Sequence, residues 1–182
     1  MSSRSPNGRV FWSAAAFVVA LDVWSKSMAV RHLTLHVPYS VFGDWMRFTL
    51  AYNPGAAFSM SLGPMSRVVF GSFAFIALIV LWRLERGTGP GEGMKALALG
   101  LAWGGACGNL IDRFKSPQGV VDFIDVGTTS WRFWTFNVAD SAVTVGAILL
   151  GLVLLEEDRR MNRAKLASQP ETVHETTDAA RQ

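Results

Sequence analysis

Residues 138–155 read VADSAVTVGAILLGLVLL, an apolar run with a single charged residue, Asp140. A helix that crosses the bilayer needs about 20 mainly apolar residues. Three more stretches of the chain have the same character, once flanking residues are counted for two of them. We therefore predict an all-α polytopic membrane protein with four transmembrane helices, at about 10–30, 66–84, 94–112 and 138–155.

The composition favours a membrane protein over a soluble domain. Charged residues make up 17% of the 182 residues, below the roughly 25% of a soluble domain. The net charge of +3 is too small to indicate nucleic-acid binding. A single cysteine, Cys107, excludes an internal disulfide, and three histidines without a cysteine pair offer little for a structural zinc site. No cofactor and no metal is expected.

The first apolar run has an alternative interpretation as a cleaved signal peptide. Arg4 and Arg9 precede it and small residues occupy 14–16, as in the basic and apolar parts of such a peptide. The run continues through Asp22 and Lys26 without a convincing cleavage site. A retained first span is therefore favoured.

Lys and Arg in the short flanking segments indicate the orientation. Basic residues gather before the first span, between the second and third spans, and after the fourth, and we place these segments and both termini in the cytoplasm. Other basic residues oppose this bias, namely Lys26, Arg31, Arg47, Arg67, Arg113, Lys115 and Arg132. Because the number of spans is even, the ends of the first and third helices and the start of the fourth meet at one face in either orientation.

Three carboxylates converge on that face. Asp22 lies within the first span, Asp112 ends the third and Asp140 begins the fourth. Carboxylates in or beside a span are costly and usually mark function or a buried ion pair. The spacing of Asp22 and Lys26 at i, i+4 favours an ion pair that orients the first helix.

Two amides accompany these carboxylates at i, i+3 spacing. Asn109 precedes Asp112, and this pair fits a hydrogen-bonded network as well as catalysis. Asn137 precedes Asp140 at a helix start, where either residue can be the N-cap. On this interpretation capping explains one of the two residues and not both.

Two outer segments have strand character. Residues 41–53, VFGDWMRFTLAYN, alternate, and residues 119–136 indicate two short strands about a Gly-Thr-Thr turn. We predict a small extracytoplasmic β-sheet and loop at the membrane surface. Its aromatic residues fit an interfacial belt, and they also fit a grip on an apolar substrate. Asp122 interrupts an apolar strand and needs a partner, for which Asp140 is the candidate.

The remaining patterns concern packing and the C-terminal tail. Gly100, Gly104 and Gly108 recur at four-residue spacing, which predicts close helix contact in a membrane. Residues 156–182 are charged and polar without an apolar period, which predicts a disordered cytoplasmic tail after a single domain over 1–155.

Five motifs of the chain, in this order, resemble those of the bacterial lipoprotein signal peptidase family, also called signal peptidase II. They are DVWSK at 22–26, NPGAAFS at 53–59, GGACGNLIDR at 104–113, VVDF at 120–123 and FNVAD at 136–140. With the four spans, the resemblance covers roughly residues 10–155.

This resemblance implies an intramembrane aspartic endopeptidase that cuts prolipoproteins before a diacylglyceryl-modified cysteine. By motif position, the catalytic pair falls on Asp122 and Asp140. The other matching polar residues would support the site or contact substrate, namely Asp22, Lys26, Asn53, Asn109, Asp112, Arg113 and Asn137. The implied partners are diacylglyceryl-modified prolipoproteins and membrane lipid, with no nucleic acid and no obligate protein partner. The implied location is the bacterial inner membrane, with the active site towards the periplasmic face.

Other functions fit the residues less well. His32 and His36 lack the HExxH pattern of a zinc peptidase, and no GxSxG indicates a serine enzyme. A transporter with a proton relay through Asp22, Asp112 and Asp140 is the main alternative, although nothing ionisable continues through the second or fourth helix to the other side. A purely structural membrane subunit would not need the outer Asn and Asp residues.

Overall fold

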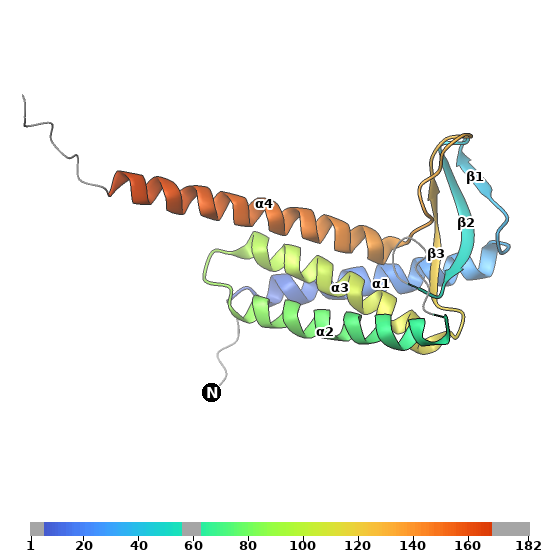
Figure 1. Cartoon of the computed structure of the whole chain (residues 1–182), viewed down its shortest axis with the longest axis horizontal. Coiled ribbons are helices and arrows are strands. Elements are labelled where there is room, and N and C mark those ends of the chain that lie inside the picture. The colour runs from blue at the N-terminus through green and yellow to red at the C-terminus, as the bar shows by residue number, and fades with distance from the viewer. Residues whose placement is uncertain (1–5, 56–62, 169–182) are drawn as a thin grey trace, which may run out of the picture.

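The computed structural model describes residues 6–55 and 63–168. Four long helices lie alongside one another, and a small sheet sits at one end of the bundle (Figure 1). The helices are α1 (Gly8–His32), α2 (Ser66–Arg86), α3 (Gly93–Lys115) and α4 (Val138–Ala167). The strands are β1 (Tyr39–Phe42), β2 (Met46–Asn53) and β3 (Val120–Val126), and a 3-10 turn, η2 (Gly63–Met65), precedes α2.

Three of these helices, α1, α2 and α4, are long and apolar enough to cross a membrane. Only 6% of the residues in the most apolar part of α2 are buried within the protein. Most of its apolar side chains therefore face outward, as in a helix that contacts lipid. Within the described residues α3 does not meet the same criterion, because glycines, Asn109 and Asp112 dilute its apolar residues. The structure thus has the four predicted helices and three clear candidate spans.

α3 packs between α1 and α4, with main chain against main chain. A Cβ atom on Gly100 would lie 2.6 Å from the carbonyl oxygen of Phe11, and one on Gly104 would lie 2.8 Å from that of Ala15. This confirms the close contact predicted from the glycine spacing. A further glycine, Gly105, faces the other neighbour, because a Cβ atom there would collide with the carbonyl oxygen of Ala139 in α4.

The sheet is antiparallel in the order β1-β2-β3. Leu50, Val121 and Phe123 form an apolar cluster with Ala29, which joins the sheet to the end of α1. The strand character predicted over 41–53 is divided into β1 and β2, because the chain turns at Gly43, whose φ of 55° suits glycine.

The second strand predicted within 119–136 is not formed. After β3, the chain makes only isolated bridges, Ile124 with Phe136 and Gly127 with Arg132. The Arg132 guanidinium instead crosses to Asp125, with Nε 2.6 Å from a carboxylate oxygen and Nη2 3.0 Å from the carbonyl oxygen. Main-chain hydrogen bonds also join this segment to β3, from the Phe133 N–H to the Val126 carbonyl oxygen at 2.9 Å and from the Phe136 N–H to the Ile124 carbonyl oxygen at 3.0 Å, but they do not form a regular strand.

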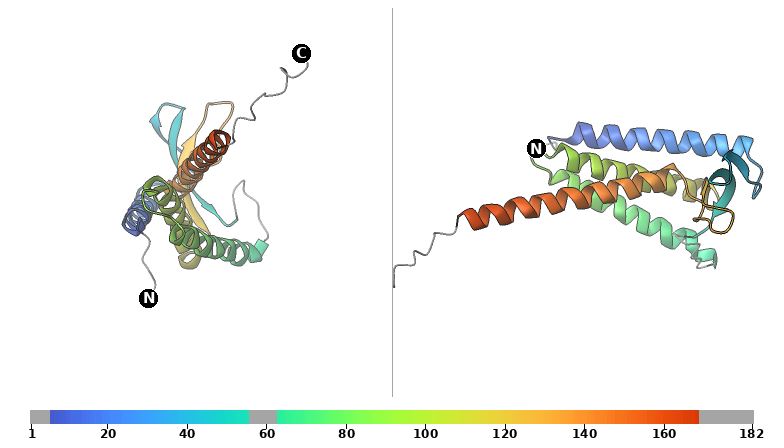
Figure 2. Two further views of the ribbon diagram at one scale, coloured as in Figure 1. Left: turned by 90° about the vertical axis from the view of Figure 1, so that its left-hand side faces the viewer. Right: turned by 90° about the horizontal axis from the view of Figure 1, so that it is seen from above.

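α4 continues past Leu155 to Ala167 and projects beyond the bundle (Figures 1 and 2). The sequence predicted disorder from 156, and this was wrong for the helical part. Pairs at i, i+4 stabilise the extension, with Arg160 Nε 3.0 Å from Glu156 Oε1. Residues 169–182 of the predicted tail lie outside the described residues.

The two ends of the bundle differ in the elements and charged residues that lie there. The start of α1 and the projecting part of α4 lie at the end away from the sheet (Figure 1). There Lys95 of α3 lies 3.0 Å from Glu157 of α4 and 3.5 Å from Glu92. At the sheet end, the ends of α1 and α3 meet the start of α4, as the even number of helices predicted.

Candidate active site

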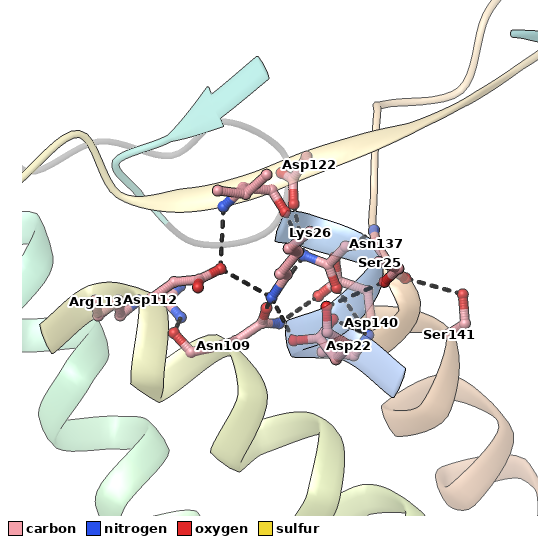
Figure 3. Close-up of polar contacts among 12 residues, drawn as sticks. Asp22, Ser25, Lys26, Asn109, Asp112, Arg113, Asp122, Asn137, Asp140 and Ser141 are labelled. Atoms are coloured by element: carbon pink, nitrogen blue, oxygen red, sulfur yellow. Dashed lines mark hydrogen bonds and ion pairs between the residues drawn. The ribbon is translucent and has the colours of Figure 1, made fainter. Parts of the chain in front are cut away.

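Eight of the nine polar residues singled out in the sequence lie together at the sheet end of the bundle (Figure 3), and the ninth, Asn53, hydrogen-bonds Asp122 in this group. They come from five elements, α1, β2, α3, β3 and α4. Asn53 closes β2, and its carbonyl-bearing side chain accepts a hydrogen bond from the Gly55 N–H at 3.0 Å. Residues 56–59 of the NPGAAFS motif lie outside the described residues.

Asp122 is buried in β3, with 4% of its surface exposed. Its Oδ1 accepts a hydrogen bond from Asn137 Nδ2 at 2.7 Å, and the Asn53 side chain also hydrogen-bonds the carboxyl group. Burial raises the pKa of Asp122 to about 7, and the negative charge of Asp140 adds to the rise, while the two amides and Lys26 oppose it. The group therefore keeps a proton close to neutral pH.

Asp140 lies in the first turn of α4 and takes part in a capping box. Asn137 Oδ1 accepts from the Asp140 N–H at 2.9 Å, and Asp140 Oδ2 accepts from the Asn137 N–H at 3.2 Å. Capping thus involves both residues, and the sequence interpretation that it explains only one was wrong. Each side chain still has a further contact, because Asp140 Oδ1 accepts from Asn109 Nδ2 at 2.7 Å.

Two amides connect the carboxylates. Asn137 Nδ2 donates to Asp122 and also to Asn109 Oδ1 at 3.1 Å, while Asn109 Nδ2 donates to Asp140. Among the described residues, Asp122 and Asp140 are therefore linked through Asn137 and Asn109 rather than by a direct hydrogen bond. The partnership predicted for Asp122 and Asp140 is one of electrostatic proximity.

Lys26 lies at the centre of the network and is 3% exposed. Its Nζ is 2.7 Å from Asp22 Oδ2 and 2.9 Å from Asp112 Oδ2. It also donates to Asn109 Oδ1 at 2.9 Å. The Asp22 contact is a close ion pair within α1. The ion pair predicted from the i, i+4 spacing is confirmed, and Asp112 is a second partner from α3.

Arg113 extends the network towards the loop after β2. Its Nη2 donates to the Gly55 carbonyl oxygen at 3.0 Å and its Nη1 to that of Asn109 at 3.2 Å. The Nε atom is buried and makes no hydrogen bond with the described residues. A guanidinium in this position can hold a carbonyl oxygen or developing negative charge.

A cavity of about 490 Å³ lies between α2 and α3 beside Arg113. Its lining is mainly apolar and includes Phe75 and Ile76 of α2 and Leu110 of α3. The sequence analysis assigned no functional residue to α2, because an outward apolar helix face has the same pattern whether it lines a cavity or meets lipid.

Gly108 does more than allow helix packing, the role that the four-residue glycine spacing predicts. A Cβ atom there would lie 2.5 Å from Asp22 Oδ2. The glycine therefore makes room for the Asp22 carboxylate between α1 and α3.

The arrangement suits acid–base chemistry. A buried carboxyl group with a raised pKa, Asp122, lies near a second carboxyl group, Asp140, so one can serve as an acid and the other as a base. Within residues 6–55 and 63–168, no three His, Cys, Asp or Glu side chains are grouped so as to hold a metal ion.

Comparison with known proteins identifies the family. A family model described as "Signal peptidase (SPase) II" matches residues 14–156. The chain belongs to the signal peptidase II family. The resemblance indicated by the five motifs is thus confirmed, and the chain is identified as a protease of lipoprotein processing.

Relatives of the signal peptidase II family support this membership. The lipoprotein signal peptidase of Mycolicibacterium smegmatis is 43% identical over 151 residues, which cover 78% of this chain and 59% of that protein. The lipoprotein signal peptidase of Pseudomonas syringae pv. tomato is 40% identical over 163 residues, 86% of this chain and 92% of that protein. A solved bacterial membrane enzyme has a TM-score of 0.76 and 30% identity, over 87% of this chain and 94% of its own.

Proposed function

We propose that this chain is an intramembrane aspartic endopeptidase that removes signal peptides from prolipoproteins by cutting before a diacylglyceryl-modified cysteine. Family membership supports the removal of signal peptides. The aspartic mechanism is supported chiefly by the geometry of Asp122 and Asp140, two carboxylates linked through Asn137 and Asn109 at one end of an apolar bundle.

In this mechanism Asp122 begins as the acid and Asp140 as the base. Its raised pKa leaves Asp122 protonated near neutral pH, so it can donate a hydrogen bond to the scissile carbonyl oxygen. Asp140 takes a proton from water as the water oxygen attacks the carbonyl carbon. When the tetrahedral intermediate collapses, Asp140 gives the proton that it took from water to the leaving nitrogen, the C–N bond breaks, and the pair returns to its singly protonated state with the proton on Asp122.

Arg113 and Asn53 would assist by binding the substrate main chain. Arg113 carries a positive charge near both carboxyl groups, and Asn53 contacts Asp122. Preorganised donors of this kind stabilise the developing oxyanion most effectively in a dry site. The apolar cavity beside Arg113 is large enough to receive part of a lipid chain.

We also propose that α3 is the fourth transmembrane helix, in a bacterial inner-membrane enzyme with both termini in the cytoplasm. In support, Arg83 and Arg86 end α2 and Lys95 begins α3 at the end of the bundle away from the sheet, where the positive-inside rule places basic residues. The site and the sheet would then face the periplasm. On this assignment, residues 1–155 form a single peptidase domain, which the family match over residues 14–156 supports.

A cleavage assay tests the proposal. Purified protein in detergent is incubated with a diacylglyceryl-modified prolipoprotein and, separately, with the unmodified precursor. We expect only the lipidated precursor to be cut, and we expect Asp122→Asn and Asp140→Asn to abolish the reaction. Folded wild-type protein that leaves the lipidated precursor intact would refute the peptidase assignment.

Asp125→Asn is a matched control for the catalytic carboxyl group. Asp125 lies on the same strand and is buried, but it pairs with Arg132 and Thr49. We expect this variant to keep cleaving. Loss of activity in Asp125→Asn equal to that in Asp122→Asn would contradict the assignment of the catalytic residue.

A further inference from the structure

Lys26 contacts two carboxylates, and each of them accepts a hydrogen bond from a main-chain N–H of another element. Asp22 Oδ1 accepts a hydrogen bond from the Ala139 N–H at 2.9 Å, and Asp112 Oδ2 accepts one from the Val121 N–H at 3.2 Å. Each carboxylate also contacts Lys26 Nζ. A single carboxylate, Asp22, thus connects the ammonium group to the main chain of α4, and a second one, Asp112, connects it to the main chain of β3.

The two main-chain partners occupy equivalent places in the sequence. Ala139 directly precedes Asp140, and Val121 directly precedes Asp122. A hydrogen bond to the N–H of a residue fixes the peptide plane next to it, and so restricts where the following side chain can lie. Lys26 therefore acts on Asp140 through Ala139 and on Asp122 through Val121, the residue that precedes each of them.

A third contact of Lys26 fixes an amide. Lys26 Nζ donates to Asn109 Oδ1, so the acceptor end of this amide must face the ammonium group. The donor end then points away from it, and Asn109 Nδ2 donates to Asp140 Oδ1. Lys26 therefore helps to set the orientation of an amide that contacts the proposed base, together with Asn137, whose Nδ2 donates to the same oxygen.

We infer that Lys26 is a positioning residue, which fixes the spacing of Asp122 and Asp140 by holding the residue before each of them through Asp22 and Asp112. This inference rests on the proposed function. The simpler role of neutralising the charges of Asp22 and Asp112 would require only a positive charge. The positioning role also requires that one group contact both carboxylates and Asn109 at once.

Charge gives a second, independent signature. The groups that act on the Asp122 carboxyl are Asp140 of α4, which raises its pKa, Lys26 of α1, which lowers it, and Arg113 of α3, whose positive charge interacts with it. Removing the Lys26 charge should raise the pKa of Asp122. Because Asp122 acts in its protonated form, the alkaline limb of the pH–rate profile should move to higher pH.

The experiment compares Lys26→Met with Lys95→Met in steady-state cleavage of the lipidated precursor in detergent. Both substitutions remove a lysine that is paired with two carboxylates, but Lys95 lies at the opposite end of the bundle. We expect Lys26→Met to lower kcat about a hundredfold with little change in KM, since small displacements of catalytic groups cost that much. Lys95→Met should keep wild-type kcat and the wild-type pH profile.

Two further variants separate positioning from charge balance. Lys26→Arg keeps the charge and several donors, and should recover kcat about tenfold relative to Lys26→Met. Lys26→Met combined with Asp22→Asn removes one charge of each sign. No group then connects residue 22, Asp112 and Asn109, so kcat should remain low. This double variant also carries the test if Lys26→Met alone does not fold.

The outcomes are distinct. Wild-type protein that does not cut the lipidated precursor refutes the proposed function itself. An active wild type together with a folded Lys26→Met of unchanged kcat and pH profile overturns the positioning role. So does an effect confined to KM, or full recovery of kcat in the double variant.

Discussion

Replacement of Asp122 by asparagine should abolish cleavage and yet stabilise the folded protein at alkaline pH. Burial raises the pKa of Asp122 from 3.8 to about 7, so the folded state binds the proton more tightly than the unfolded state. Ionising the folded carboxyl group therefore costs (7 − 3.8) × 1.36, or about 4 kcal/mol, relative to the unfolded chain. Asparagine does not ionise, and its Oδ1 can still accept the hydrogen bond from Asn137.

The sign of the effect sets its pH dependence. The cost is absent below the unfolded pKa of 3.8, grows between 3.8 and about 7, and is constant above that. Thermal and denaturant unfolding of the purified protein in detergent should therefore give Asp122→Asn an advantage of roughly 2 kcal/mol at pH 5 and roughly 4 kcal/mol at pH 8.

Asp125→Asn is again the control for this measurement. It weakens the ion pair with Arg132 and should not gain stability as the pH rises. If Asp122→Asn is no more stable than the wild type at pH 8, or if its advantage does not grow from pH 5 to pH 8, the reasoning from burial is wrong.

Three other predictions follow from described contacts. The cleavage rate should fall about tenfold per pH unit above about 7, as Asp122 loses its proton, and a rate that stays flat to pH 9 would contradict its role as the acid. Gly105→Ala should lower the free energy of unfolding by about 1–3 kcal/mol because its Cβ would collide with the α4 main chain. Its control is Gly151→Ala in α4, where a Cβ would meet no other atom, and this variant should raise the free energy of unfolding by about 0.5–1 kcal/mol. Equal melting temperatures for the two variants would refute the packing argument. Arg132→Met should cost about 1–3 kcal/mol by removing charged hydrogen bonds to Asp125, and thermal unfolding would show no change if the loop after β3 were held by other contacts.

The sequence predicted where the site lies, and the reason is the parity of the helices. An even number of apolar runs brings Asp22, Asp112 and Asp140 to one end of the bundle, and the structure has them there. The sequence did not predict that Asp22 accepts from the N–H of Ala139, 117 residues away. Such a bond depends on the packing of α1 against α4, which no local pattern encodes.

Local patterns were also limited in the segments outside the spans. Residues 119–136 were predicted to form two short strands about a Gly-Thr-Thr turn, but only β3 forms, and the segment after it pairs through isolated bridges and through the Arg132 side chain. Charge and polarity after Leu155 suggested disorder, but pairs one turn apart maintain a helix to Ala167. In both cases the average composition of the segment did not predict its local structure.

The glycine contacts between α1 and α3 have a mechanical consequence. Because Gly100 and Gly104 touch carbonyl groups of α1, no rotamer can adjust to let one helix slide along the other. Asp22 lies further along the same helix, at a distance from these contacts that is fixed by the helix. Because Asp22 binds the N–H of Ala139, this distance sets how far along the bundle the proposed catalytic pair lies. Inserting one alanine between Ala15 and Asp22 would turn Asp22 by about 100° around the helix axis and should abolish cleavage, and unchanged cleavage would refute the idea. The place of the proposed site along the bundle would then be set by main-chain contacts between helices and not by side-chain packing.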